Sequence, residues 1–275
     1  MKNLLLLLFA LSLFSCQENM PVIPPPPNPG DAARKVIVEE FTGVQCSGCP
    51  SGSAELENLL AIYGDNLVVV SIHTSDFGNP FPESQHDFRT AAGEELVNYL
   101  GNPFAYPSAV INRKDFDGGS YRLQYGKDKW NGFINEELVD TPRITVNLTK
   151  SFDFTTRELR AQISGVAVED LTGEVRLTVM VTETGIIDPQ LDESAGLILD
   201  YKHKHVFRAT LTNTKGDPLG TDMAEGDAYD VTKSIIIPDG PEGWIPENCE
   251  IIAFVNLVNG QNKEVLQVEA TQVQD

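Results

Sequence analysis

Two cysteines separated by two residues stand between a strand pattern and a helix pattern in this chain. Residues 35–41 form a β-rich run, and residues 49–63 carry apolar side chains at helical spacing. Pro50 suits the first turn of such a helix, because the N–H group that proline lacks would have no partner there. The sequence therefore predicts a strand-to-helix turn, with Cys46 at the start of the helix and Cys49 one turn further in.

The first half of the chain alternates between strand and helix signals. Residues 66–73 are almost continuously apolar, as in a strand that is covered on both faces. Helical spacing returns over residues 86–100, followed by a strand pattern over 108–112 and a helical pattern over 123–138. Strands that alternate with helices predict a mainly parallel sheet with helices on its faces. We therefore expect an α/β domain over residues 34–141.

From Pro142 onward the hydrophobic period changes to two. The alternation is clearest over residues 143–149, 158–163 and 174–181. Further strand-like runs cover residues 205–211, 234–237, 250–258 and 265–270. Short strands separated by Gly, Asp, Asn and Pro turns predict an antiparallel β-sandwich of the immunoglobulin-like kind over residues 142–275.

The N-terminus has the pattern of an export signal. Lys2 precedes the apolar run 4–14, which is about half as long as the roughly 20 residues of a membrane-spanning helix. Residues 13–16, Leu-Phe-Ser-Cys, resemble the lipobox of bacterial lipoproteins, which implies cleavage after residue 15 and lipidation of Cys16. A simple cleaved signal with an incidental cysteine is the alternative. Residues 16–33 are rich in proline and are expected to form an extended stalk.

The charge of the chain excludes some partners. With residues 1–15 removed, 19 basic and 40 acidic side chains leave a net charge of −21. Such a chain is repelled by nucleic acid and by anionic lipid surfaces. We therefore expect no nucleic-acid partner, and attachment to a membrane only through a lipid anchor.

The cysteine pair has the chemistry of a redox couple. An exported protein meets an oxidising compartment, where a disulfide is permitted. Free N–H groups at a helix start stabilise a thiolate, which makes Cys46 the nucleophile and Cys49 the resolving thiol. A purely structural disulfide is one alternative. Zinc is another, but zinc needs four ligands and a second Cys-x-x-Cys motif is missing, so no metal or other cofactor is expected.

Three residues in the second half carry weaker signals. His203 and His205 would share one face of a strand, a possible metal pair, although packing or surface histidines are commoner. Cys249 begins an apolar strand and is expected to be a buried, inert thiol.

Residues 38–50, Val-Glu-Glu-Phe-Thr-Gly-Val-Gln-Cys-Ser-Gly-Cys-Pro, resemble the active-site strand, loop and helix of the thioredoxin superfamily. The resemblance implies a thioredoxin-like fold for residues 34–141. It also implies that Glu40, six residues before Cys46, is the buried acid that assists proton transfer at the resolving cysteine. Pro107 would be the cis-proline that faces the disulfide and contacts substrate, with Tyr106 beside it. The alternatives are a surface glutamate and an ordinary trans turn.

The motif departs from the superfamily pattern in its immediate surroundings. Gln45 stands where a tryptophan usually precedes the first cysteine, and the intervening pair is Ser-Gly instead of Gly-Pro. The sequence has no Lys, Arg or His between Phe41 and Glu55, so only the helix start favours the thiolate. A less stabilised thiolate makes a weaker oxidant, and the sequence leaves the direction of exchange open.

The complete plan of lipobox, proline stalk, Cys-x-x-Cys domain and C-terminal β-domain resembles the Omp28-like outer-membrane lipoproteins of Bacteroidetes. The resemblance implies residence at the outer membrane, on the periplasmic or the cell-surface side, and implies little about activity. Two hypotheses follow. One is thiol–disulfide exchange with exported proteins, and the other is a redox-inactive surface lipoprotein that serves binding or adhesion. A Cys46 sulfur exposed beside Pro107 would favour exchange, and one shielded by the second domain would favour binding.

Overall fold

The computed structural model describes residues 33–119, 123–240 and 243–274. The expected signal peptide, the lipidated Cys16 and the proline-rich stretch that ends at residue 32 lie outside the described residues.

The first part of the chain folds into a small sheet with helices on both faces. In chain order its elements are β1 (Val36–Thr42), α1 (Cys49–Tyr63), η1 (Gly64–Asn66), β2 (Leu67–His73), η2 (Asp76–Gly78), α2 (Ala91–Leu100), β3 (Ser108–Ile111) and α3 (Lys127–Leu138). The strands expected at 35–41, 66–73 and 108–112 and the helix expected at 49–63 are confirmed within one residue at each end. β1 and β2 are parallel, with Val36 opposite Leu67.

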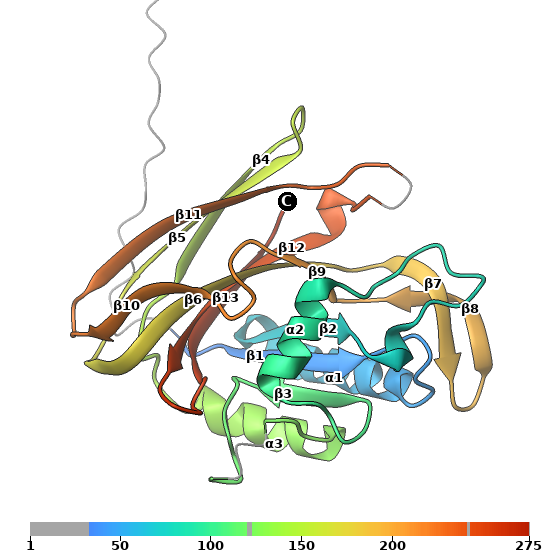
Figure 1. Cartoon of the computed structure of the whole chain (residues 1–275), viewed down its shortest axis with the longest axis horizontal. Coiled ribbons are helices and arrows are strands. Elements are labelled where there is room, and N and C mark those ends of the chain that lie inside the picture. Colours follow the sequence, from blue (N-terminus) through green and yellow to red (C-terminus); the bar gives the residue numbers. More distant parts are fainter. Residues whose placement is uncertain (1–32, 120–122, 241–242, 275) are drawn as a thin grey trace, which may run out of the picture.

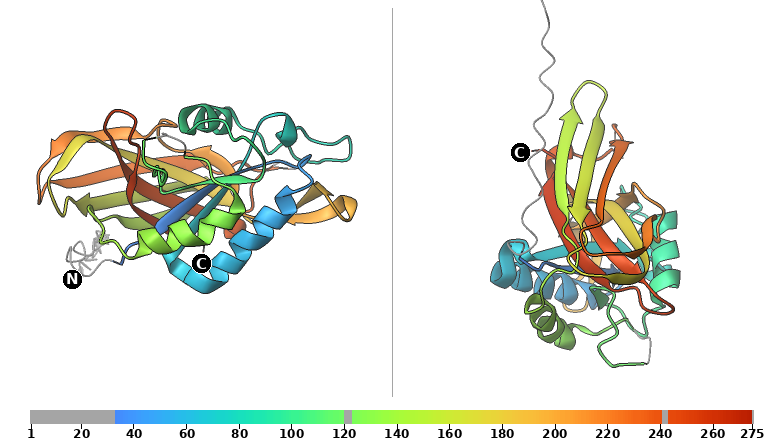
Figure 2. Two further views of the ribbon diagram at one scale, coloured as in Figure 1. Left: turned by 90° about the horizontal axis from the view of Figure 1, so that it is seen from below. Right: turned by 90° about the vertical axis from the view of Figure 1, so that its left-hand side faces the viewer.

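Helices α1 and α3 cover one face of this sheet, and α2 covers the other (Figures 1 and 2). Because side chains alternate across a strand, Val36 and Val38 face α1 and α3, whereas Ile37 and Phe41 face α2. The same alternation places Glu40 on the face of Val38. All seven residues of β1 are buried, including its two glutamates.

Three expectations for this region need correction. The sheet is mixed instead of mainly parallel, because β3 runs antiparallel to β1. Helix α2 starts at Ala91 and not at residue 86, because the Thr90 hydroxyl accepts a hydrogen bond from the Gly93 N–H and so caps the helix. Helix α3 starts later than residue 123, because the backbone of Tyr125 pairs with that of Ala109 at the edge of β3.

The second part of the chain consists mainly of strands. In chain order its elements are β4 (Asn147–Asp153), β5 (Glu158–Val166), β6 (Leu171–Glu183), β7 (Ile186–Asp192), β8 (Gly196–His203), β9 (Val206–Thr210), β10 (Asp217–Met223), β11 (Ala228–Ile236), η3 (Pro246–Asn248), β12 (Cys249–Val258) and β13 (Val265–Gln272). Each expected strand overlaps one of these. The alternating pattern does not predict β7, β8 or β10. In β7, Pro189 interrupts the pattern and the register shifts around it.

One large sheet runs through both parts of the chain. Its strand order is β13-β12-β6-β9-β2-β1-β3, and β10 pairs with the first half of β6. Strand β9 joins the two halves, since it lies antiparallel to β6 and beside β2, where Val206 pairs with Ser71. The change of pattern expected near residue 141 therefore does not interrupt the sheet (Figure 1).

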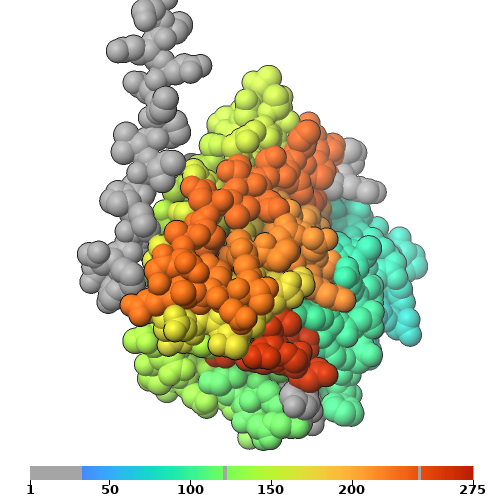
Figure 3. Space-filling view, turned by 60° about the vertical axis from the view of Figure 1, so that its left-hand side comes forward, coloured from blue at the N-terminus to red at the C-terminus, as the bar shows by residue number. Residues whose placement is uncertain are grey.

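A second, antiparallel sheet of β11, β5 and β4 packs on the β6 and β12 part of the large sheet. The core between them is lined by inward residues of both layers, among them Leu159, Ala161, Ile163, Val175, Val179, Ile251 and Val255. Strands β10 and β11, in orange, form much of the outer face of this region (Figure 3). The protein is thus β-rich, with mixed and antiparallel sheets and few helices.

Candidate functional site

The cysteine pair lies at the junction of β1 and α1. Cys46 is in the turn before the helix and Cys49 is the first residue of α1, so both lie about one turn earlier relative to the helix than the sequence predicts. The structure joins Cys46 and Cys49 in a disulfide, with their Cα atoms 5.4 Å apart. The turn is held by its own backbone, since Cys46 N–H donates to the Gly43 carbonyl at 3.1 Å and Cys49 N–H donates to the Cys46 carbonyl at 3.2 Å. Pro50 occupies the first turn of α1.

Pro107 packs against the first turn of α1. The Tyr106–Pro107 peptide bond is cis. A Cβ atom at Gly52 would lie only 2.7 Å from Pro107 Cγ, so the close approach of ring and helix requires glycine there. At Gly48, inside the disulfide loop, the corresponding distance to Pro107 Cδ is 3.8 Å. Tyr106 is half-buried and its ring centroid lies 5.1 Å from that of Phe77.

Glu40 is a fully buried side chain and not a surface residue. It lies beneath α1, since a Cβ atom at Gly52 would be 2.9 Å from its Oε1 atom. Its Oε2 atom accepts a hydrogen bond of 2.8 Å from the Ser71 hydroxyl of β2, and Oε1 has no hydrogen-bond partner among the described residues. Burial raises the pKa of Glu40 to about 7, although the Ser71 hydrogen bond acts in the opposite direction. A carboxyl with this pKa gives up or accepts a proton readily at neutral pH.

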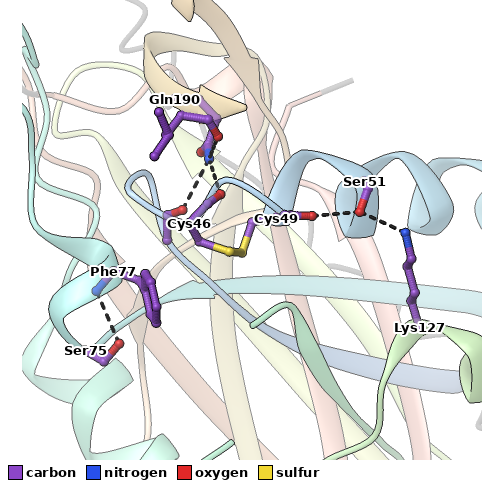
Figure 4. Close-up of a disulfide and its surroundings, with 10 residues drawn as sticks. Cys46, Cys49, Ser51, Ser75, Phe77, Lys127 and Gln190 are labelled. Carbon is purple, nitrogen blue, oxygen red and sulfur yellow. Dashed lines mark hydrogen bonds between the residues drawn. A yellow bond between two sulfur atoms is a disulfide. The ribbon is translucent and has the colours of Figure 1, made fainter. Parts of the chain in front are cut away.

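The β7–β8 hairpin covers the disulfide. Its backbone runs along the cysteine loop, where Leu191 N–H donates to the Val44 carbonyl at 2.8 Å and Glu193 N–H donates to the Ser47 carbonyl at 3.0 Å. The Gln190 amide donates to the carbonyls of Gly43 at 3.3 Å and Cys46 at 3.1 Å (Figure 4). Under this cover Cys46 is 4% exposed and Cys49 is 1% exposed. A segment of the second part of the chain therefore shields the disulfide.

The end of the hairpin is anchored by a buried histidine. The ring of His203 at the end of β8 lies 5.6 Å from that of His73 at the end of β2, 4.7 Å from Phe88 and 4.8 Å from Tyr201, measured between centroids. Its Nε2 atom is 3.2 Å from the Asp188 carbonyl oxygen. Burial lowers the pKa of His203 to about 4. Burial also holds the pKa of His73 well below its usual value, so both rings are neutral at neutral pH.

Acid should weaken this anchor. Because the pKa of His203 is about 4 when folded against 6.5 for the free side chain, the neutral ring stabilises the fold above pH 6.5, and this contribution is lost as the pH falls from 6.5 toward 4. At about 1.4 kcal/mol per pKa unit, the stability of the wild type relative to His203→Gln should fall by about 2–3 kcal/mol between pH 7 and pH 4.5. Denaturant unfolding at each pH measures the free energy of unfolding of both proteins. Because both contain Glu40, the titration of Glu40 cancels when the two free energies are subtracted. A difference independent of pH would contradict the assignment.

His203 and His205, which the sequence pattern places on one face of a strand, lie in different surroundings in the structure. His203 is a packing residue, whereas the Nε2 atom of His205 lies 3.2 Å from Glu57 Oε1 on α1. Within residues 33–119, 123–240 and 243–274, no group of three or more His, Cys, Asp or Glu side chains is placed to hold a metal ion. Cys249 is buried, as expected, and burial raises its pKa to about 12, which keeps the thiol protonated and inert.

Sequence reasoning missed two residues of this site. Ser71, the partner of Glu40, follows four apolar residues and precedes another in β2, and this polar interruption could have marked it as a residue with a buried partner. Gln190 carries no such signal, because its contacts with the cysteine loop depend on how a distant hairpin folds back. Among the residues that the structure describes, no helix is long and apolar enough to cross a bilayer.

Two solved structures share this β-rich fold. HBP35 of Porphyromonas gingivalis is 19% identical, with a TM-score of 0.65 over 87% of this chain and 75% of that chain. Protein AGR_C_4864 from Agrobacterium tumefaciens is 14% identical, with a TM-score of 0.53 over 89% of this chain and 96% of that chain. At these identities the likeness shows the fold alone. A search among curated proteins finds no match.

The family follows from the sequence of the last two thirds of the chain. The model of the family described as outer membrane protein Omp28 matches residues 98–275, which is more than half of the chain. The chain belongs to the Omp28 outer membrane protein family, as its overall plan leads us to expect. The protein is therefore associated with the outer membrane. The match begins after the Cys46–Cys49 motif, so it does not bear on the resemblance to the thioredoxin superfamily.

Proposed function

We propose that the chain is an outer-membrane lipoprotein that carries out thiol–disulfide exchange with exported proteins through Cys46 and Cys49. In this proposal residues 34–141 form a thioredoxin-like unit and residues 142–275 an immunoglobulin-like one. The observation that carries the proposal is Glu40, a buried carboxyl with one oxygen that has no partner in the described part of the chain, beneath the helix that Cys49 begins. A purely structural disulfide needs no acid at this place with a pKa of about 7.

The chemistry of partner oxidation begins with the attack of a partner thiolate on Cys46 Sγ. The Cys46–Cys49 bond breaks as the bond to the partner forms, and Cys49 leaves as a thiolate that receives a proton from Glu40. A second partner thiolate then attacks the partner's own sulfur in the mixed disulfide and releases Cys46, so the partner is oxidised and the pair is reduced. Partner reduction follows the same steps in reverse. Pro107 and Tyr106 contact and position the partner polypeptide beside the disulfide.

The Glu40→Gln variant tests the role of the acid. Glutamine keeps an acceptor for Ser71 but cannot exchange a proton, and general acid–base groups contribute about 10²- to 10⁴-fold. We expect the purified protein to reduce the disulfides of insulin, with dithiothreitol as electron donor, and the variant to do so at least tenfold more slowly, with a loss of pH dependence near pH 7. Wild-type activity no higher than that of Cys46→Ser at every pH would overturn the proposal.

A second candidate function is favoured by the cover over the disulfide. If the pair is only a structural bridge under the hairpin, the protein is a redox-inactive binding or adhesion lipoprotein. The two functions differ in the reduction potential of the Cys46–Cys49 pair, which a titration against glutathione and dithiothreitol buffers measures. A value below about −300 mV is typical of a structural bridge, and a higher value is typical of a working couple.

The lipid anchor at Cys16 gives a separate prediction. Neither the charge of the chain nor a helix of the described residues offers another attachment. We expect Cys16→Ala to leave the outer-membrane fraction while the folded part keeps its circular dichroism spectrum, because the attachment of acyl chains is lost. Cys249→Ala, which removes a buried cysteine, is the matched control and should stay with the membrane. If Cys16→Ala fractionates as the wild type does, a protein partner and not the lipid holds the chain there.

A further inference from the structure

Three cations from separate parts of the chain converge on the ring of Tyr99, near the end of α2. The distance to the ring centroid is 5.0 Å for Lys263 Nζ, 5.5 Å for Lys215 Nζ and 5.9 Å for the guanidinium carbon of Arg113. The two ammonium nitrogens lie 5.5 and 5.0 Å from one point and are therefore at most 10.5 Å apart. The ring attracts each cation, but the cations repel one another, so an anion between them would stabilise the cluster.

The turn that carries Lys215 is fixed by the neighbouring strand. The Gly216 N–H donates to the Asn213 carbonyl at 2.8 Å, and the Gly216 carbonyl accepts a hydrogen bond of 3.0 Å from Arg176 on β6. Gly216 has a φ of +85°, and a Cβ atom there would lie 2.9 Å from Thr178 Oγ1 on β6. The turn before β10 and the connection between β12 and β13 thus come to lie beside α2 (Figure 2).

The charge of the two lysines is not neutralised by a carboxylate of the described residues. Within these residues Lys215 Nζ has no hydrogen bond or ion pair, and Lys263 Nζ has only a hydrogen bond of 3.3 Å to the Gln261 carbonyl. Burial, and then the charge of Arg113, lowers the pKa of Lys263. Arg113 itself is neutralised by Glu39. Two positive charges therefore remain at this place in a chain whose net charge is −20.

Hydrogen-bond donors beside the ring also lack acceptors. Arg113 uses Nε and Nη2 to bind Glu39, so its Nη1 atom points away from that carboxylate, and it is buried with no partner among the described residues. Burial raises the pKa of Tyr99, so its hydroxyl keeps its proton, and no hydrogen bond engages this hydroxyl in the described part of the chain. Buried donors without acceptors are uncommon. Together with the two lysines they indicate a site for an anion.

We propose that this cluster binds a phosphate monoester group, with the phosphoryl oxygens between Lys215 and Lys263. Such a group carries a charge of about −1.5 to −2 at pH 7 and so matches two lysines, whereas a carboxylate matches only one. Lysine binds phosphate as a point charge with three donors. Two sources carry this chemistry, a soluble phosphate ester and a lipid headgroup. The site shares no residue with the disulfide site and does not depend on the proposed exchange activity.

Calorimetric titration of the purified Cys16→Ala protein with phenyl phosphate is the first test. We expect one saturable site per chain, and binding of benzenesulfonate, which has the same ring but a single charge, that is about fivefold weaker or less. Adding Lys215→Gln and Lys263→Gln should weaken phenyl phosphate binding by about tenfold or more. Lys129→Gln with Lys202→Gln removes the same charge from exposed positions on α3 and β8 and should leave binding unchanged.

Sedimentation with vesicles identifies the source of the group. If the Cys16→Ala protein sediments with phosphatidylcholine vesicles that contain phosphatidic acid, and the variant that also lacks Lys215 and Lys263 does not, the group belongs to a lipid. Binding of phenyl phosphate without such sedimentation indicates a soluble ester.

Two results would overturn the site. One is phenyl phosphate binding that is equal with and without the two lysines, which would place the anion elsewhere. The other is a folded protein that binds neither phenyl phosphate nor the vesicles. Both measurements report binding alone, so they stand whether or not Cys46 and Cys49 exchange disulfides.

Discussion

Replacing Gln190 by alanine should raise the rate at which a small thiol reduces the Cys46–Cys49 disulfide by about 5- to 150-fold. The Gln190 amide holds the hairpin to the cysteine loop through the carbonyls of Gly43 and Cys46. Each hydrogen bond contributes about 0.5–1.5 kcal/mol net, so the loss of both makes opening of the cover about 1–3 kcal/mol easier. The rate of reduction by dithiothreitol, followed by the appearance of free thiols, measures the effect.

Leu199→Ala is the matched control for this experiment. Leu199 lies on β8 of the same hairpin, but its side chain is 59% exposed. The control should therefore reduce at the wild-type rate. If Gln190→Ala and Leu199→Ala react equally fast, the hairpin does not limit access to the disulfide. In that case the small exposed fraction of Cys46 would reflect only the folding of the cysteine loop itself.

Replacing Arg113 by methionine should cost the fold about 3–5 kcal/mol, the largest loss of stability that we expect from a single side chain. Arg113 donates two hydrogen bonds of 2.7 Å to the Glu39 carboxylate, and both side chains are fully buried. The guanidinium carbon also lies 4.7 Å from the ring centroid of Phe254 on β12. The variant would leave the Glu39 charge buried without a partner, at the contact between the two parts of the chain.

The double variant Glu39→Leu with Arg113→Met tests the cause. Removing both charges should recover most of the loss, because an apolar pair of similar volume leaves no buried charge behind. Thermal unfolding should show Arg113→Met about 6–20 °C below the wild type, at roughly 2–4 °C per kcal/mol for a chain of this size. A double variant as unstable as Arg113→Met would mean that the packing of Arg113, and not its charge, is what matters.

The local structure around the disulfide could be predicted from the sequence. The β-rich pattern of β1, the proline in the first turn of α1 and the helical spacing up to Tyr63 involve neighbouring residues only. Such patterns act through backbone sterics and through the period of the side chains, which short segments carry by themselves. The first residues of α2 and α3 could not be predicted as well, because a threonine cap and a backbone pairing with β3 determine where these helices begin.

The two glutamates of β1 show what local sequence patterns cannot predict. Glu39 and Glu40 are adjacent, and alternation along the strand places them on opposite faces. The resemblance to a known motif pointed to Glu40 as the functional acid. Nothing in the sequence of β1 itself shows that Glu39 pairs with an arginine whereas Glu40 has a raised pKa. That difference comes from Arg113 beyond β3 and from Ser71 on β2. Burial raises the pKa of Glu40, which has one hydroxyl as its partner, whereas Glu39 is paired with the Arg113 guanidinium.

By itself the sequence determined the order of strands and helices near the cysteines, the change to a β-rich second part and the family. Only the tertiary structure decided how far the disulfide is accessible to solvent and to other molecules. The cover is made by β7 and β8, which the sequence pattern does not predict, and its contact through Gln190 joins residues 147 positions apart. Contacts between such distant residues depend on how whole sheets stack, and the spacing of side chains within one segment carries no information about that.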